Sequence, residues 1–579
     1  MGPSPTPAVL HNGRFFTSQG TNGRAHAFTE CIVIDALGLI AHVGSLTDPE
    51  VARADAAGAV RHDMQGRVVL PGFVEGHMHL LRLGQSLQNV ALDDCRNLRD
   101  IRDTIKCYAR DHPDVPRICC KGWMYAMLTE GEEASTGLLD DLDPRPIYID
   151  EKSLHSTWCN TAAVEEMGLQ DMPDPQGGKI HRDASGNPTG VLAESAVMLV
   201  VWPHLAKVAS MEEKLSALQG AIASYTSEGY TGAVDMAFDE NMLEAVRVLR
   251  KLKEGKLPIR LAAHWLITPR ASEAENVAQV DRAIELWREF KDESDFRIAG
   301  IKIICDGIVD ACTAALTEPY SSNGANGDLL WTVEDIVPLV RKADQAGLQC
   351  ALHAIGDLAV RTTIDALEQA ATPNADKRHR IEHLEMSSPE DAARLGKLGI
   401  TASVQPVHAD PAILKAWPRL LGEDRCGRAF AYKDFADGGA VLALGCDAPT
   451  APHAALKNIY TAATRRSARD PALMMDNGEG AAAAAKMMNP QFALELAAAV
   501  AAATAGSAYS CFMDRWAGRL EKGLSADLAV VEMEWEAEKL LEARVRETWF
   551  RGLGFTRVRR HGRRGTSILA CNIDLHVPT

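Results

Sequence analysis

The sequence predicts an α/β fold, a distorted (β/α)8 TIM barrel with a composite β-sandwich from both chain ends and an inserted cap. The main observation is that short apolar runs, typical of buried strands, alternate with longer helix-like runs. Nine strand-like runs occur, at residues 72–80, 145–151, 230–236, 259–267, 297–307, 348–355, 379–385, 400–406 and 440–448. This number is close to what a barrel needs, and we assign the surplus to the insertion.

Helix-like runs at 211–229, 335–347, 359–371 and 389–399 separate many of these strands. A repeated strand-then-helix order is typical of a parallel sheet. A doubly wound open sheet is the alternative architecture. Because neither a G-x-G-x-x-G nor a G-x-x-x-x-G-K-[ST] loop opens any of these helices, the nucleotide-binding form of that alternative is disfavoured.

Both chain ends contain short strand-like pieces punctuated by turn residues. We therefore predict that residues 1–70 and 506–579 form the two parts of the β-sandwich, since chain ends commonly meet at a domain surface. Residues 71–505 are predicted to form the barrel. Within it, residues from about 85 to 210 interrupt the strand–helix rhythm with polar and Pro/Gly-rich stretches, which indicates an inserted cap.

The composition is that of an ordinary globular protein, with 579 residues, of which 46% are hydrophobic and 24% charged. A net charge of −17 disfavours nucleic acid and anionic membranes as partners and favours a small molecule. The 13 cysteines form no C-x-x-C pair and the N-terminus does not have the pattern of a secretory signal, so we expect a cytoplasmic protein. The apolar tract 492–509 contains a glutamate and many alanines, which predicts a buried or amphipathic helix and not a membrane span.

Two histidines, His77 and His79, stand one residue apart after the apolar run "VVLPGF". Alternate residues of a strand point to the same side, so both imidazoles are expected to converge on one small volume, as metal ligands do. A bare H-x-H pair is also common by chance. Four further candidates lie in later strand-like runs, Lys302, His353, His383 and Asp447. Because catalytic groups gather at the C-terminal ends of barrel strands, this ordered set predicts one metal-dependent site.

Five motifs, in order along the chain, carry a resemblance to a known family. They are "PGFVEGHMH" (71–79), "KIICDG" (302–307), "HAIGD" (353–357), "RIEH" (380–383) and "CDAP" (446–449). With these motifs the sequence resembles the metal-dependent amidohydrolase superfamily, and within it the YtcJ-like branch, amidohydrolase family 3. The segment "GRLEKGLSADLAVVE" (518–532) is similar to the closing β-module of that family, so the resemblance covers nearly the whole chain.

The resemblance implies a set of metal ligands, His77, His79, Lys302, His353, His383 and Asp447. The first two histidines would bind one divalent metal, and the other two would bind a second or share the site. Lys302 matches a lysine that this branch can carry as a carbamate bridging two metals, whereas its alternative role is a salt-bridging or neutral buried lysine beside Asp306. Imidazole and carboxylate ligands suit zinc, so one or two Zn²⁺ ions, or another divalent metal, are expected.

The implied activity is hydrolysis of the C–N bond of an amide-type compound other than a peptide, by a metal-activated hydroxide. Asp447 is the expected general base, which later passes the proton to the leaving nitrogen. The same metal site could instead run ester hydrolysis, decarboxylation or a lyase step, because a fold does not fix the chemistry. An inactive metal-binding regulatory relative is the alternative from a different class. The resemblance also implies a homodimer.

Segments of the insertion match segments that approach the substrate in the resembled family. Together with two barrel positions they give the expected substrate-binding set, Trp123, His155, Trp158, Glu194, Asp306 and Asp310. The Trp- and Met-containing "GWMYAML" predicts a partly apolar acyl or aryl substrate. The stretch "IVDACTA" (308–314) stands where relatives often have SLGSRTA, so substrate choice does not transfer. Glu382, next to His383, is expected to face the opposite side of its strand in a structural role.

Overall fold

The computed structural model describes residues 5–556, apart from residues 20, 22–24, 130–131, 153, 176, 373–375 and 471–487. The chain divides into two compact units, one formed by Met1–His79 with Ile222–Thr579 and the other by Leu80–Ala221. The insertion predicted at about 85–210 falls within the second unit.

The first unit contains a parallel sheet of eight strands that curls into a nearly closed barrel. Strands that follow one another in the chain are also neighbours in this sheet. The strands are β8 (Phe73–Met78), β15 (Tyr230–Phe238), β16 (Arg260–Ile267), β17 (Phe296–Ile304), β18 (Gln349–Ala354), β19 (Arg380–His383), β20 (Thr401–Val404) and β21 (Leu442–Leu444). Most of their residues are buried, because strands covered by helices outside and filled by side chains inside have no solvent face. The predicted barrel is confirmed.

The first and last strands meet where the barrel closes. The backbone N–H of Asp447 donates to the carbonyl of His77 at 2.7 Å, and the N–H of His79 donates to the carbonyl of Ala448 at 3.0 Å. Two glycines permit this approach, since a Cβ on Gly76 would lie 2.6 Å from the Leu444 carbonyl oxygen and one on Gly445 would lie 2.5 Å from the His77 nitrogen. A doubly wound open sheet is therefore wrong for this chain.

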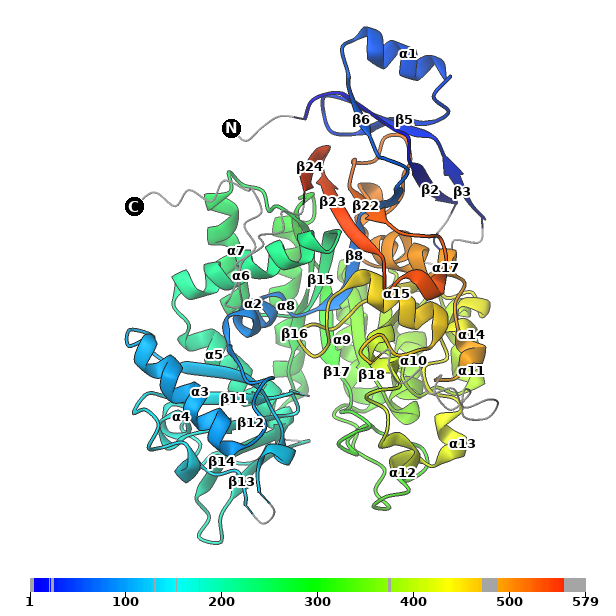
Figure 1. Ribbon diagram of the computed structural model, residues 1–579. Coiled ribbons are helices and arrows are strands. Elements are labelled where there is room, and N and C mark those ends of the chain that lie inside the picture. Colours follow the sequence, from blue (N-terminus) through cyan, green and yellow to red (C-terminus); the bar gives the residue numbers. More distant parts are fainter. Residues whose placement is uncertain are drawn as a thin grey trace, which may run out of the picture. The chain divides into compact units, whose positions relative to one another are not determined.

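Helices connect successive barrel strands, and α8, α9 and α10 lie on the outside of the sheet (Figure 1). Several begin at side chains that accept a hydrogen bond from the first turn, such as Asp239, Ser272, Thr332 and Ser388. The helices are α6 (Met211–Ser227), α7 (Glu240–Leu252), α8 (Glu273–Phe290), α9 (Val333–Ala346), α10 (Asp357–Ala370), α11 (Pro389–Lys397), α12 (Trp417–Leu421), α13 (Glu423–Cys426), α14 (Tyr432–Asp437), α15 (Ala455–Thr464), α17 (Leu496–Ala501) and α18 (Ser507–Ser510).

Strands from the two ends of the chain lie side by side in one module of the first unit (Figure 1). A six-stranded sheet has the order β24 (Leu553–Thr556), β23 (Arg544–Phe550), β22 (Leu528–Glu532), β7 (Val68–Pro71), β2 (Arg14–Gln19) and β3 (Ala25–Thr29). A four-stranded sheet has the order β5 (Ile40–Gly44), β4 (Cys31–Ile34), β1 (Ala8–His11) and β6 (Val60–Asp63), with α1 (Pro49–Ala56) before β6. Buried side chains from both sheets and both chain ends share one core, as in a sandwich.

The second unit has its own mixed sheet. The strand order is β13 (Gly178–Arg182), β14 (Pro188–Glu194), β12 (Ser156–Cys159), β11 (Ile147–Glu151), β10 (Ile118–Trp123) and β9 (Val90–Ala91). Its helices are α2 (Leu80–Gln88), α3 (Leu98–Asp111), α4 (Thr161–Met167) and α5 (Trp202–Val208). Separate apolar clusters of this unit lie against α3 and against α4, so the insertion is a domain with its own core.

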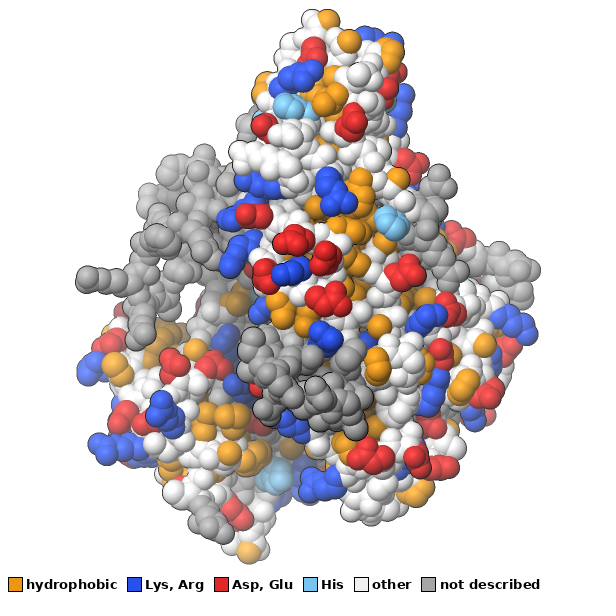
Figure 2. Space-filling view, turned by 45° about the vertical axis from the view of Figure 1, so that its right-hand side comes forward, with side chains coloured by type: hydrophobic (Ala, Val, Ile, Leu, Met, Phe, Trp, Pro, Cys, Tyr) orange, Lys and Arg blue, Asp and Glu red, His pale blue; other side chains and the backbone are white. Residues whose placement is uncertain are grey.

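On the face shown in Figure 2, acidic and basic side chains intermingle. Some surface side chains of opposite charge form ion pairs, such as Arg61–Asp55 and Arg247–Glu289, each with an N–O distance of 2.6 Å. Among the described residues no helix is long and apolar enough to cross a membrane. The tract 492–509, predicted to be a buried or amphipathic helix, contains α17 and most of α18 with a π-helical turn between them, and most of its side chains are buried. The cytoplasmic location and the homodimer stay predictions.

Candidate active site

The first histidine pair and Asp447 come together at the C-terminal end of the closing strands. His79 Nε2 lies 3.1 Å from Asp447 Oδ1, and His77 Nε2 lies 3.6 Å from the same oxygen. One donor atom from each of the three side chains lies within 4.8 Å of the others, and each side chain is mostly buried. Two imidazoles and a carboxylate in this arrangement are a fitting donor set for a divalent metal such as zinc.

Burial and charge set the protonation of this cluster. Burial, reinforced by Lys302, lowers the pKa of His77 to about 4, so its imidazole is neutral near pH 7 and can act as a ligand. Burial alone would raise the pKa of Asp447, but His77 and His79 outweigh it and hold that pKa well below its usual range. The carboxyl is therefore ionised, the form that binds metal or accepts a proton.

The remaining histidines predicted as ligands adjoin this cluster. The ring centroid of His383 lies 4.8 Å from that of His77 and 4.4 Å from that of His353. Burial, followed by the charge of His353, holds the pKa of His383 well below its ordinary value. The Nδ1 atom of His383 is buried and has no hydrogen-bond partner among the described residues. The structure thus brings the four predicted histidines into one chain of adjacent rings.

Lys302 lies on β17 and is 2% exposed. Within the part of the chain that the structure describes, its Nζ has no hydrogen-bond partner, so the expected alternative of a salt bridge to Asp306 is not formed. Burial lowers the pKa of Lys302 to about 8. The neutral amine, which is the form that can combine with carbon dioxide, is consequently accessible near neutral pH.

The role expected for Glu382, facing away from the site, is wrong. Glu382 Oε2 lies 2.7 Å from Nδ1 of His77, and Arg380 donates to Glu382 Oε1 at 2.7 Å. Burial would raise the pKa of Glu382, but Arg380 and then His77 lower it far below its ordinary value. The ionised carboxylate therefore fixes the proton of His77 on Nδ1 and leaves Nε2 toward Asp447.

Backbone geometry explains why neighbouring residues of β19 both serve the site. His383, the last residue of the strand, has a φ of +77°, and Leu384 has a φ of +53°. This left-handed turn ends the regular alternation of side chains that the sequence argument assumed for Glu382. Asp447 also has a positive φ, +57°, and such positions cost about 1–3 kcal/mol each and cluster at functional sites.

Two further buried carboxylates hold the surrounding backbone. Glu75 Oε1 accepts the N–H groups of His77 at 3.1 Å and Cys446 at 2.7 Å, so it ties β8 to the segment after β21. Asp306 accepts the N–H groups of Ala315, Ile355 and Gly356 at 2.8–3.0 Å. Its carboxylate is held by these backbone groups and is 1% exposed, and the substrate contact predicted for Asp306 stays a prediction.

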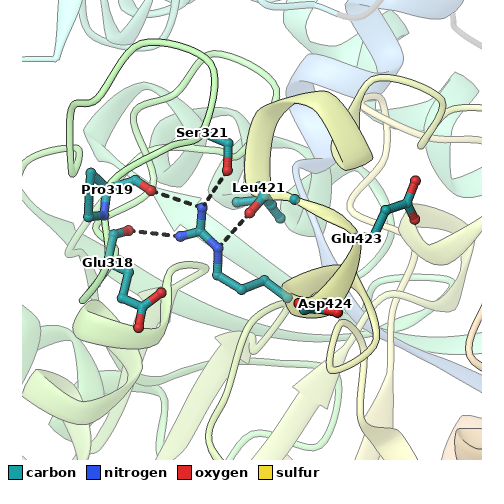
Figure 3. Close-up of a pocket in the computed structure, with 8 residues that line it drawn as sticks. Glu318, Pro319, Ser321, Leu421, Glu423 and Asp424 are labelled. Carbon is teal, nitrogen blue, oxygen red and sulfur yellow. Dashed lines mark hydrogen bonds between the residues drawn. The ribbon is translucent and has the colours of Figure 1, made fainter.

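The loops after β17 and β20 are joined at the same end of the barrel. Arg425 donates to the carbonyls of Glu318, Pro319 and Leu421 at 2.6–2.9 Å, beside a pocket of about 420 Å³ (Figure 3). Asp310 lies in the first of these loops, is exposed, and accepts a hydrogen bond from Trp417 Nε1 at 3.2 Å. Its predicted contact with substrate stays a prediction.

Sequence reasoning missed two residues of the barrel end, Glu385 and His408. His408 lies in the short 3₁₀ turn Pro406–Ala409 after β20, and its Nδ1 is 3.2 Å from Glu385 Oε1. Its Nε2 lies 4.0 Å from Asp447 Oδ2, and its ring is parallel to that of His383 with centroids 6.0 Å apart. The H in "QPVHAD", just after a strand-like run, was the available signal.

Four predicted substrate-binding residues belong to the insertion. Trp123 and Trp158 are 0% exposed, and their ring centroids are 5.2 Å apart in one of its apolar cores. His155 Nδ1 lies 3.3 Å from Glu194 Oε2, and both side chains are partly exposed. The tryptophans thus have a packing role, whereas the contact of these four residues with a substrate stays a prediction.

The chain belongs to the amidohydrolase family, whose family model matches residues 62–553. It is similar to YtcJ of Bacillus subtilis (strain 168), with 28% identity over 90% of this chain and 94% of that protein. It is also similar to the N-substituted formamide deformylase of Arthrobacter pascens, with 26% identity over 84% of this chain and 89% of that protein. The YtcJ-like resemblance predicted from five motifs is confirmed.

A solved structure shares the fold. The crystal structure of an uncharacterized metal-dependent hydrolase from Pyrococcus horikoshii OT3 has a TM-score of 0.71 with this chain. The match has 23% identity and covers 92% of this chain and 98% of that one. The fold is therefore shared over most of this chain with a protein of similar length.

Proposed function

We propose that this protein is a metal-dependent hydrolase that cleaves the C–N bond of a non-peptide amide at the cluster of His77, His79 and Asp447. The observation that carries the proposal is the convergence of three mostly buried donor atoms within 4.8 Å at the C-terminal end of the barrel. A divalent ion there, with zinc as the expected ion, would polarise the carbonyl of the amide and make a water molecule more acidic.

The protein groups divide the remaining work. Glu382, fixed by Arg380, sets the tautomer of His77 so that Nε2 points at the ion site. Asp447 is ionised and has Oδ1 beside the two histidines, so it is positioned to accept a proton from the attacking water and to deliver it to the leaving nitrogen. Protonation of that nitrogen lets the amine depart.

Lys302 completes the proposal. Its neutral amine would combine with carbon dioxide, forming an N–C bond and releasing one proton, to give a carbamate that could serve as a metal ligand. Support comes from the buried Nζ without a partner among the described residues and from its lowered pKa. An ammonium could not act as a ligand, whereas a carbamate can.

Relatives guide the choice of substrate. The Arthrobacter pascens relative is named for removing a formyl group from N-substituted formamides. We therefore propose N-substituted amides, including formamides, as the substrate class. The apolar acyl or aryl group predicted from "GWMYAML" stays a prediction, because Trp123 and Met127 of this segment pack in the core of the insertion.

The test is a panel of N-substituted formamides, short and long N-acyl amides and matched esters, with the released amine, acid and alcohol identified. We expect amine and carboxylate in equal amounts from at least one amide class, and a loss of about 10²–10⁴-fold in Asp447→Asn. Asp292→Asn, at an exposed position, is the control. Release of products from esters alone, or undiminished amide turnover in Asp447→Asn, would overturn the proposal.

A further inference from the structure

Two loops at the C-terminal end of the barrel reach the candidate centre. One runs from β17 to α9, over residues 305–332, and the other runs from β20 to α14, over residues 405–431. The carbonyl oxygen of Gly307, in the first loop, lies 3.4 Å from Nε2 of His353, and the second loop contains His408. We call these two segments the rim loops, because they leave the strands at the end of the barrel where catalytic groups gather.

Arg425 connects the two rim loops through its guanidinium group (Figure 3). From the second loop, Nη1 donates to the carbonyl of Glu318 at 2.9 Å, and Nη2 donates to the carbonyl of Pro319 at 2.8 Å. Nη2 also donates to the hydroxyl of Ser321 at 3.2 Å, while Nε donates to the carbonyl of Leu421 in its own loop at 2.6 Å. The planar fork of the guanidinium therefore acts as a clamp on the backbone of both loops.

Apolar packing does not fill the space between the rim loops at this point. A pocket of about 420 Å³ is lined by residues of both loops, Glu318, Pro319, Ser321 and 421–425. Other hydrogen bonds between the loops include that from the Ser321 N–H to the Leu420 carbonyl at 2.8 Å and that from Trp417 Nε1 to Asp310 at 3.2 Å. Because Arg425 supplies three hydrogen bonds across the pocket, it is a main link between the loops where their packing is open.

Contacts run from the rim loops to the candidate centre. Trp417, which donates to Asp310, stacks on Phe430 with ring centroids 5.1 Å apart. The N–H of Phe430 donates to the carbonyl of Glu385 at 2.8 Å, and Glu385 Oε1 lies 3.2 Å from Nδ1 of His408. A shift of the second rim loop would therefore displace side chains beside the centre, because packed side chains transmit such a shift.

We propose that Arg425 is a positioning residue for the substrate. By joining the rim loops it holds Asp310, Trp417 and His408 around the candidate centre, and it acts on the substrate only through them. This inference rests on the proposed function, because it assigns a role in binding the amide that the centre would cleave. The candidate ion site lies on β8 and the segment after β21, outside the rim loops, so Arg425 governs the binding of substrate more than the cleavage of the bond.

Steady-state kinetics of Arg425→Gln and Arg425→Lys, both loaded with Zn²⁺, test this role with the amide of the panel that is cleaved fastest. The glutamine cannot span the carbonyls of both loops, so kcat/KM should fall about 10²-fold, mainly through a higher KM. The lysine keeps a charge and donors for some of these carbonyls, so it should restore part of that loss. The control is Arg250→Gln, because Arg250 pairs with Asp295 at 3.0 Å at the N-terminal end of β17. This variant should lower the melting temperature and leave KM unchanged.

Hydrogen exchange followed by mass spectrometry gives a second readout, which does not require turnover. Peptides from both rim loops should exchange faster in Arg425→Gln than in the wild type, whereas peptides from β17 and β20 should not change. Arg250→Gln should leave the exchange of the rim loops at the wild-type level.

Three results would overturn the proposal. They are an unchanged KM in Arg425→Gln whatever the change in kcat, an equal rise of KM in Arg250→Gln, and wild-type exchange of both rim loops in Arg425→Gln. If the wild-type protein cleaves no amide, the proposed function fails, while the exchange experiment still decides whether Arg425 joins the rim loops.

Discussion

The carboxylate of Glu382 holds the imidazole of His77, a candidate metal ligand, with Oε2 2.7 Å from Nδ1. Arg380, which is 0% exposed, neutralises this carboxylate and also donates to the carbonyl of Gly76 at 2.7 Å. Strands β8 and β19 are thereby joined across the barrel interior by one buried ionic network. The orientation of a candidate ligand and the stability of the barrel depend on the same side chains.

Glu382→Gln tests this network. The amide keeps an acceptor for His77 but leaves Arg380 buried without its counter-charge, a loss of about 3–5 kcal/mol for a buried pair. We expect a lower melting temperature and a metal affinity or activity reduced about 10–100-fold. Calorimetry and zinc titration measure these effects, with exposed Glu542→Gln as the control. Wild-type zinc affinity in Glu382→Gln would show that the carboxylate does not orient the ligand.

Carbamate formation at Lys302 can be tested by spectroscopy. Protein equilibrated with ¹³C-labelled bicarbonate should give a carbamate carbon signal by nuclear magnetic resonance, because the amine is buried and its pKa is lowered to about 8. The signal should be absent from Lys302→Met. The control is Lys377→Met, because the Lys377 amine donates a hydrogen bond to the carbonyl of Asp344. An identical spectrum with and without Lys302 would rule out the carbamate.

His264 makes the barrel sensitive to acid. Burial, reinforced by Arg380, lowers its pKa to about 3, and Nε2 lies 2.8 Å from Gln349 Oε1. Since the unfolded chain takes up a proton below about pH 6.5 and the folded chain does not until about pH 3, this residue removes stability as the pH falls through that window. Within this window, one such group lowers the free energy of unfolding by up to about 1.4 kcal/mol for each pH unit.

His264→Gln keeps a donor for Gln349 and removes this proton uptake. We therefore expect the melting temperature to fall less between pH 6.5 and pH 5 in the variant than in the wild type, even if the variant is less stable at pH 7. Parallel calorimetric scans at several pH values measure the difference. Equal falls in both proteins would mean that His264 does not contribute.

Substitution of the paired tryptophans of the insertion tests whether these side chains pack the core or bind substrate. Trp158 Nε1 donates to the carbonyl of Ser135 at 2.9 Å, whereas Trp123 Nε1 has no partner among the described residues. Both Phe variants should be less stable than the wild type. Trp158→Phe should lose about 1 kcal/mol more free energy of unfolding than Trp123→Phe, because it also loses one hydrogen bond. The ratio of kcat/KM between two amide substrates should not change. A changed ratio in either variant would instead support the predicted substrate contact.

The sequence predicts those candidate site residues that can be placed from the strand to which they belong. The H-x-H pair, His353, His383 and Asp447 each stand at or just after the end of a barrel strand, and catalytic groups of a barrel gather at that end. Glu382 was misjudged because the alternation rule fails where His383 adopts a positive φ. Glu385 and His408 were missed because their proximity, 3.2 Å between Nδ1 and Oε1, depends on how the loops after two strands fold.

The insertion shows the same limit. Trp123 and Trp158 are 35 positions apart in the numbering, and their contact depends on the pairing of β10, β11 and β12. No local pattern distinguishes a tryptophan that lines a pocket from one that fills a core, since both positions favour large apolar side chains. Burial within the folded domain supplied that distinction.

The most direct test of the central claim is to remove metal with a chelator and add Zn²⁺ back in steps, measuring bound ion and amide hydrolysis in the same samples. We predict no turnover in the metal-free protein, recovery that follows the occupancy of the His77–His79–Asp447 site, and little recovery in His77→Gln. Full turnover by the metal-free protein would contradict the account, because the reaction would then not depend on an ion at this cluster.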